Sequence, residues 1–153
     1  MPTSRRISFR FLLTALSFLC GLAGAIAAET GERRVALVIG NSSYRAAPTL
    51  PNPGNDAQDV AAALRAVGFE VIEGRDLDRR GMGEALGRFA RAAVDADAAL
   101  FYYAGHGLQF RGENFLLPID SAPNDEFAIP YETTRVADVI DALQNAKGVR
   151  LLI

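Results

Sequence analysis

Two short apolar runs constrain the fold of this chain more than any other feature. They are VALVIG at residues 35–40 and AALFYYAG at residues 98–105. Neither run alternates with polar residues, both contain branched or aromatic side chains, and each ends in glycine. Such runs are typical of strands buried on both faces, which occur in parallel sheets covered by helices. We therefore expect an α/β domain built on a parallel sheet.

Segments with helical spacing separate these runs. The first predicted helix covers residues 56–67, with Asn55 available as its N-cap and Gly68 as its stop. FEVIEG at residues 69–74 follows as a second strand. A second helix is predicted from apolar residues that recur at helical spacing, which are Met82, Leu86, Phe89, Ala90 and Ala93.

The pattern changes after residue 107. The polar RGEN between the apolar ends of LQFRGENFLLPID (108–120) predicts a hairpin outside the main sheet, and a third helix is predicted from 134 to 148. VRLLI at 149–153 indicates a fourth core strand. This order of elements predicts an open, mostly parallel α/β sheet with helices on both faces. Because a helix normally follows a parallel strand and covers one face, we expect a fragment that is incomplete at its C-terminus.

The first 28 residues do not fit this domain. A basic stretch, MPTSRRISFR, precedes an apolar one, FLLTALSFLCGLAGAIA, and AIA at residues 25–27 offers small residues for cleavage. This order predicts a secretory signal peptide over residues 1–28, or an uncleaved membrane anchor, followed by one domain over residues 29–153. In either case we expect the domain to be exported, to the periplasm or the medium.

The composition excludes several kinds of site and partner. The only cysteine, Cys20, lies in the apolar stretch and would leave with the signal, so the mature chain would have no disulfide and no zinc site of the usual kind. Removing the three arginines of the basic stretch leaves 13 of the 16 basic residues against 18 acidic ones, without a basic cluster. We therefore expect no metal, no cofactor and no nucleic-acid partner.

His106 is the only histidine of the chain, and it lies between Gly105 and Gly107 at the end of the predicted third strand. Ligands of open α/β sheets bind at the carboxyl ends of the strands, where an imidazole can transfer protons near neutral pH and flanking glycines leave space. The alternative is a turn residue that hydrogen-bonds the backbone. A base also needs a nucleophile. The visible candidates, none of which lies in a nucleophile-elbow motif, are Ser42, Ser43 and Ser121.

Four stretches carry a resemblance to a known family. VALVIGNSSY, LPNPGNDAQDVAAALRAVGFEV, LFYYAGHG and the terminal VRLLI resemble the large-subunit region of bacterial caspase-like peptidases, the group that contains metacaspases. The resemblance covers about residues 33–153 and implies a cysteine endopeptidase. By the motif match, His106 would be the dyad histidine, and Gly107 would contribute its backbone N–H to the oxyanion hole.

The same resemblance predicts where the nucleophile belongs. In these families it follows the fourth strand in an Asp-x-Cys setting, which this sequence does not reach. Cys20 precedes the whole domain and cannot substitute for it. We therefore expect the 153-residue chain to be inactive by itself as a peptidase.

The resemblance also implies a specificity residue. In metacaspases an acidic residue of the NDA block helps to bind a basic P1 side chain, and the matching residue here is Asp56. A carboxylate attracts arginine or lysine and repels aspartate, so we expect a basic P1 preference. The alternative role for Asp56 is structural, because a negative charge in the first turn of a helix interacts favourably with the helix dipole.

Several other residues have structural interpretations. Tyr44 and Arg45 lie in the long loop after the first strand and could line the crevice, but we favour solvent-exposed positions for both. Tyr102 and Tyr103 are expected in the strand core, with one hydroxyl reaching a polar neighbour. The residues expected to face water are Glu113 and Asp120.

Three functions are compatible with the sequence. The leading hypothesis is an exported caspase-like cysteine peptidase that acts on polypeptides. The alternatives are a non-catalytic caspase-like binding or regulatory module, and a domain that binds a small molecule without covalent chemistry. A membrane partner is expected only if the N-terminal segment is retained, and the sequence leaves the oligomeric state open.

Overall fold

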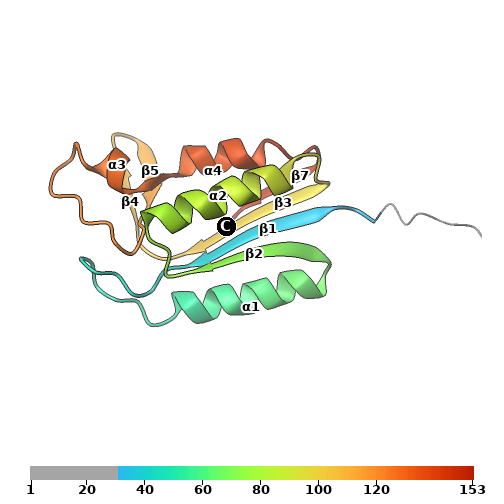
Figure 1. The fold of residues 1–153 in the computed structure, drawn as a ribbon, viewed down its shortest axis with the longest axis horizontal. Coiled ribbons are helices and arrows are strands. Elements are labelled where there is room, and N and C mark those ends of the chain that lie inside the picture. Colours follow the sequence, from blue (N-terminus) through green and yellow to red (C-terminus); the bar gives the residue numbers. More distant parts are fainter. Residues whose placement is uncertain (1–30) are drawn as a thin grey trace, which may run out of the picture. The chain divides into compact units, whose positions relative to one another are not determined.

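Four parallel strands form the main sheet of the computed structural model, which describes residues 31–153 (Figure 1). The strands are β1 (Arg34–Gly40), β2 (Phe69–Arg75), β3 (Ala98–Ala104) and β7 (Val149–Leu152). Their order in the sheet is β2-β1-β3-β7, and every neighbouring pair is parallel. The predicted parallel α/β sheet is therefore confirmed. The predicted signal segment and Cys20 lie outside the described residues.

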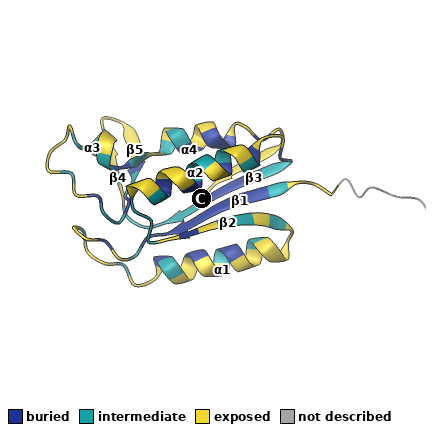
Figure 2. Cartoon of the chain, viewed as in Figure 1, coloured by how far each residue is buried: buried dark blue, intermediate teal, exposed yellow. Residues whose placement is uncertain are grey.

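Helices cover both faces of this sheet, as predicted (Figure 1). Helix α1 (Pro53–Ala66) packs on one face, against Ala36 and Val38 of β1. Helices α2 (Arg79–Ala93) and α4 (Val136–Leu143) pack on the other face. The buried residues of that second layer include Leu37, Ile39, Met82, Phe89, Phe101 and Leu143. Both faces of β1 are therefore buried (Figure 2), which explains its unbroken apolar sequence.

Helix α1 begins three residues earlier than the sequence pattern predicts. Asn52, and not Asn55, precedes its first turn, and the Asn52 carbonyl accepts the N–H groups of Asn55 and Asp56. Pro53 at the first helical position accounts for the difference, because its fixed φ suits the first turn and its missing N–H would have no helical partner there. The predicted stop is confirmed, since Gly68 has a φ of +85°.

The predicted hairpin is present and lies in a second sheet. It consists of β4 (Gly107–Phe110) and β5 (Glu113–Leu116), joined by Arg111 and Gly112, which both have positive φ. Two positive φ values match the twist of a two-residue hairpin turn. The short α3 (Ile129–Glu132) and β6 (Thr134–Arg135) were not predicted, and β6 pairs with β5, so the third helix starts at Val136.

Two further observations describe the surface of this part of the chain. The apolar side chains of β7 are substantially exposed, with Leu151 at 43% and Leu152 at 48%, and Ile153, directly after the strand, is 62% exposed. Within residues 31–153, no helix combines the length and the apolar character needed to cross a membrane.

Candidate active site

The carboxyl edge of the main sheet brings three chain segments together. They are the loop of residues 41–52 after β1, His106 just after β3, and the end of β7. Tyr103 donates its N–H to the Ile153 carbonyl at 3.1 Å, and Ile153 donates to Phe101 at 2.9 Å. The end of β7 therefore lies beside β3, three residues before His106. The first, third and fourth strands of the sequence pattern, β1, β3 and β7, are thus neighbours in the sheet.

The imidazole of His106 is held from the long loop. Its Nε2 lies 2.8 Å from the carbonyl oxygen of Pro48. Because a carbonyl oxygen only accepts hydrogen bonds, we assign the proton of the neutral ring to Nε2, which leaves the lone pair on Nδ1. The Tyr44 ring packs against the imidazole with centroids 4.6 Å apart and planes tilted by 54°. The ring is therefore oriented with one nitrogen free to accept a proton.

Two tyrosine hydroxyls hold the backbone of His106. The His106 N–H donates to the Tyr44 hydroxyl at 2.7 Å, and the hydroxyls of Tyr44 and Tyr103 are 3.0 Å apart. The Tyr103 hydroxyl in turn lies 2.9 Å from the carbonyls of both His106 and Leu117. Burial raises the pKa of both tyrosines, so both hydroxyls keep their protons. One order of donors fits the network: Tyr44 donates to Tyr103, and the single hydroxyl proton of Tyr103 is shared between the carbonyls of His106 and Leu117.

This network explains why position 105 is glycine. A Cβ at Gly105 would lie 2.5 Å from the hydroxyl oxygens of both Tyr44 and Tyr103. The expectation that Gly105 leaves room for a ligand is wrong, because the two hydroxyls fill that space. The residue permits the close approach that fixes the backbone of His106 instead.

Gly107 is exposed at the start of β4. The Leu117 N–H donates to the His106 carbonyl at 3.0 Å, and the next opposed pair in the register is Gly107 with Leu116. Hydrogen-bonded and non-bonded pairs alternate in an antiparallel ladder, so the N–H of Gly107 points away from β5. The group is free for a ligand, while its oxyanion role stays a prediction.

Tyr44 is buried, with 6% of its surface exposed, and the prediction of a solvent-exposed position is wrong. Its contacts with His106 and Tyr103 supply the reason, since its hydroxyl is satisfied inside the fold. Arg45 is exposed, as predicted. Tyr103 confirms the expectation that one strand tyrosine reaches polar neighbours, whereas Tyr102 packs on the opposite face, towards α1.

Asp56 lies in the first turn of α1 and is exposed. The first turn of α1 follows the loop after β1, at the carboxyl edge of the sheet, and burial, with a smaller contribution from the charge of Asp56, raises the pKa of Tyr102 in β3. Asp56 is thus at the same edge of the sheet as His106. Its position is compatible with both the specificity role and the helix-dipole role, and both stay predictions.

The remaining polar candidates serve the fold. Glu113 is exposed as expected, but Asp120 is partly buried and accepts the Arg79 N–H at 2.9 Å, so its predicted position was wrong. The Ser121 hydroxyl is buried without a hydrogen-bond partner among the described residues. Within residues 31–153 no three His, Cys, Asp or Glu side chains cluster in a way that could hold a metal ion.

Two functional candidates were missed by sequence reasoning. Pro48 contributes only a backbone carbonyl, which no residue type reveals. Asn41 is fully buried directly after β1, and its side chain bonds the Leu117 carbonyl at 3.1 Å and the Leu77 N–H at 2.9 Å. A polar residue that directly follows the apolar run VALVIG was the available signal for Asn41, because buried amides require specific partners.

Comparison with known proteins places this geometry in a family. Residues 33–152 match the family model for the caspase domain, peptidase C14. Human mucosa-associated lymphoid tissue lymphoma translocation protein 1 is 38% identical over 91 residues, which are 60% of this chain and 11% of that protein. Its mouse homologue matches over the same share of the chain. The chain therefore spans a small part of the length of these curated relatives.

Two solved structures share the fold at low sequence identity. The Drosophila initiator caspase Dronc matches with a TM-score of 0.60 and 11% identity, over 79% of this chain and 48% of that one. Protein GSU0716 from Geobacter sulfurreducens matches with a TM-score of 0.59 and 21% identity, over 78% and 48%. With the family model extending from β1 to β7 and both structures sharing the sheet, the chain belongs to the caspase-domain family.

Proposed function

We propose that this chain is the histidine-bearing part of a cysteine endopeptidase, and that residues following β7 supply the thiol. One observation carries the proposal: the Pro48 carbonyl holds Nε2 of His106 at 2.8 Å, which leaves Nδ1 as a base. Membership in the peptidase C14 family supports a protease-type activity on polypeptides. The end of β7 lies beside β3, so residues following Ile153 would emerge near the imidazole.

The proposed reaction uses the His106 ring, the thiol, the Gly107 N–H and the Pro48 carbonyl. Nδ1 of His106 takes the proton of the thiol, and the thiolate attacks the peptide carbonyl carbon, forming a C–S bond. The N–H of Gly107 stabilises the resulting oxyanion. The imidazolium then passes its proton to the leaving amine as the C–N bond breaks, and water hydrolyses the thioester. The Pro48 carbonyl accepts from Nε2 throughout and stabilises the imidazolium.

The test requires a longer protein that includes the residues after Ile153. We expect it to cleave arginyl or lysyl reporter peptides, and iodoacetamide to abolish this activity. His106→Ala should lower kcat by about 10²–10⁴-fold, the usual contribution of a general acid or base. Gln109→Ala, an exposed change on the same hairpin, should leave kcat unchanged.

The same assay distinguishes the alternative function. The 153-residue chain should show no cleavage, because its only cysteine precedes the domain. If the longer protein resists iodoacetamide, or if His106→Ala retains full activity, the chain is not part of a cysteine peptidase. A binding or regulatory module would then be the better interpretation.

We also propose that Asp56 selects a basic P1 residue. The Asp56→Asn variant of the longer protein should lose about 10–100-fold in kcat/KM on arginyl substrates, as expected when a hydrogen bond between charged groups is removed. Asp59→Asn provides a matched control, because Asp59 is an exposed aspartate of the same helix. Equal discrimination between arginyl and aspartyl substrates before and after the Asp56 change would contradict the assignment.

A further inference from the structure

Asp76 lies just after β2, outside the proposed catalytic groups, yet its carboxylate is aimed at the loop that carries Pro48. One carboxylate oxygen accepts the N–H groups of Ser42 at 2.7 Å and Ser43 at 2.9 Å. The other accepts the Ser43 hydroxyl at 2.8 Å. The Asp76 N–H donates to the Gly40 carbonyl at 3.0 Å. The carboxylate therefore fixes the first two loop residues after Asn41 to the end of β2.

Ser42, which Asp76 holds, also forms hydrogen bonds with the other end of the loop. Its carbonyl accepts the Leu50 N–H at 3.1 Å, and its hydroxyl accepts the Gly54 N–H at 3.1 Å. The hydrogen bond from Leu50 to Ser42 thus closes the loop on itself, and Leu50 is two residues beyond Pro48. A shift of Ser42 would move the Pro48 carbonyl, which is the group that holds the imidazole.

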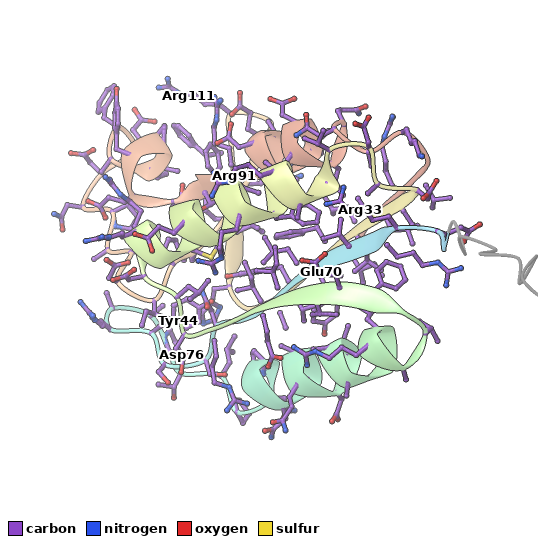
Figure 3. All side chains as sticks on the ribbon, turned by 45° about the vertical axis from the view of Figure 1, so that its right-hand side comes forward. Arg33, Tyr44, Glu70, Asp76, Arg91 and Arg111 are labelled. Carbon is purple, nitrogen blue, oxygen red and sulfur yellow. The ribbon has the colours of Figure 1, made fainter. Side chains whose placement is uncertain are left out.

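The backbone at Asp76 suits this task. Its φ is +49°, a left-handed conformation that aspartate tolerates better than most residues. Figure 3 shows Asp76 beside Tyr44, and the charge of Asp76 adds to burial in raising the pKa of that tyrosine. Burial raises the pKa of Asp76 itself, but the hydrogen bonds from Ser42 and Ser43 outweigh it and lower the pKa overall. The carboxylate is therefore charged at neutral pH.

We propose that Asp76 is a positioning residue for His106, and that it acts by anchoring the loop that presents the Pro48 carbonyl to Nε2. The proposal rests on the proposed function for its catalytic meaning, but its physical content is independent of activity. It states that the ring tautomer of His106 depends on a carboxylate that the imidazole does not touch.

The tautomer can be measured directly, because His106 is the only histidine of the chain. In a ¹⁵N-labelled sample above the imidazole pKa, long-range proton–nitrogen correlations report both ring nitrogens. A ring held as Nε2–H gives one protonated and one unprotonated nitrogen with widely separated shifts. A ring released from Pro48 exchanges between tautomers, and the two shifts move together.

Asp76→Gly removes the carboxylate and relieves the positive φ, so the chain should still fold. We expect the two nitrogen shifts to converge in this variant. Asp76→Asn keeps an acceptor oxygen and should restore most of the separation. Asp95→Gly is the matched control, because Asp95 also has a positive φ, of 58°, but its side chain forms no hydrogen bond within residues 31–153. We expect this variant to keep the wild-type separation of the two nitrogen shifts.

Wild-type shift separation in a folded Asp76→Gly variant would overturn the proposal, as would equal convergence in Asp95→Gly. If Asp76→Gly does not fold, Ser43→Ala removes one of the three hydrogen bonds and should give a smaller convergence; no change there would also overturn it. In the longer protein, Asp76→Gly should lower kcat and leave KM unchanged. If the longer protein cleaves no reporter peptide but the tautomer of His106 still depends on Asp76, the proposed peptidase function is refuted and the positioning role of Asp76 stands.

Discussion

The two edges of the main sheet each carry an aspartate that accepts backbone N–H groups, but the two are used differently. At the amino edge Asp97 accepts the Arg33 N–H at 2.8 Å and pairs with Lys147 at 3.2 Å. At the carboxyl edge Asp76 accepts Ser42 and Ser43. Figure 3 shows Arg33 at one end of the sheet and Asp76 with Tyr44 at the other.

The surroundings of the two carboxylates explain the difference. Around Asp97 the contacts are mostly main-chain ones: its N–H donates to the Arg33 carbonyl, and its own carbonyl accepts the Val149 N–H. Around Asp76 the carboxylate binds Ser42 and Ser43, and the loop that these serines begin carries the Pro48 carbonyl, which contacts the His106 ring. The amino edge closes the fold with backbone groups that cannot move independently. The carboxyl edge holds its site with side chains as well as with the Pro48 carbonyl, and these side chains can change without breaking the sheet.

The largest predicted difference between the edges concerns two glycines. A Cβ at Gly148 would collide with the backbone carbonyl of Asp97, whereas one at Gly105 would meet the ends of two tyrosine side chains. We expect Gly148→Ala to lower the free energy of unfolding by about 3 kcal/mol or more, and Gly105→Ala by about 1–2 kcal/mol, since overpacking costs depend on how far the neighbours can shift. Urea unfolding of the two variants and the wild type measures both losses of unfolding free energy.

The nitrogen shifts of the His106 ring give a second way to compare the two glycine variants. Gly105→Ala should also disturb the nitrogen shifts of His106, because the tyrosines that hold its backbone must move, while Gly148→Ala should leave them unchanged wherever the protein is folded. If Gly105→Ala proves the more destabilising change, the amino edge is not the more rigid one.

The main sheet was the easier part of the fold to predict from the sequence. The apolar runs of β1 and β3 and the strand at 149–152 follow from local composition, because burial on both faces demands apolar residues in sequence. The start of α1 was misplaced because the side chain of Asn52 makes no capping hydrogen bond and Pro53 determines the first turn. The short α3 and β6 have too few residues to show any periodicity.

The site was predictable only in part. His106 and Gly107 could be chosen because their residue types and their place after a strand carry chemical meaning. The contact from Pro48 to His106 joins residues 58 positions apart and uses a backbone carbonyl, so no local pattern encodes it. The burial of Tyr44 likewise depends on a hydroxyl partner 59 positions away. Contacts of this kind follow from the tertiary fold and not from the sequence near either residue.

Two adjacent tyrosines of β3 give a comparison of intermediate size. Tyr103→Phe removes the hydroxyl that satisfies the carbonyls of His106 and Leu117, and should lower the free energy of unfolding by about 1–3 kcal/mol. Tyr102→Phe is the matched control, because its hydroxyl makes no hydrogen bond within the described part of the chain. We expect a change within about 0.5 kcal/mol for it. Equal losses in urea unfolding would mean that the hydroxyl network does not stabilise the carboxyl edge.

The smallest predicted effect is on the stability of the protein in acid, and we expect it to be similar for the aspartates of the two edges. Hydrogen bonds from the Arg33 N–H and from Lys147 lower the pKa of Asp97, and those from Ser42 and Ser43 lower the pKa of Asp76 against the effect of burial. The folded state therefore favours both charged forms. The resulting stability is present above the ordinary aspartate pKa of about 4 and is lost as the pH falls through the lowered folded values.

Asp76→Asn and Asp97→Asn should each flatten the dependence of the unfolding free energy on pH below about pH 4, and leave its shape above pH 5 unchanged. Among the described residues the two carboxylates share no hydrogen-bond partner, so the effects should add in the double variant. A double variant whose acid limb superimposes on that of the wild type would show that neither carboxylate is preferentially charged in the folded state. A loss larger or smaller than the sum would mean that the edges are coupled through the strands between them, and the division between a rigid amino edge and an adjustable carboxyl edge would not hold.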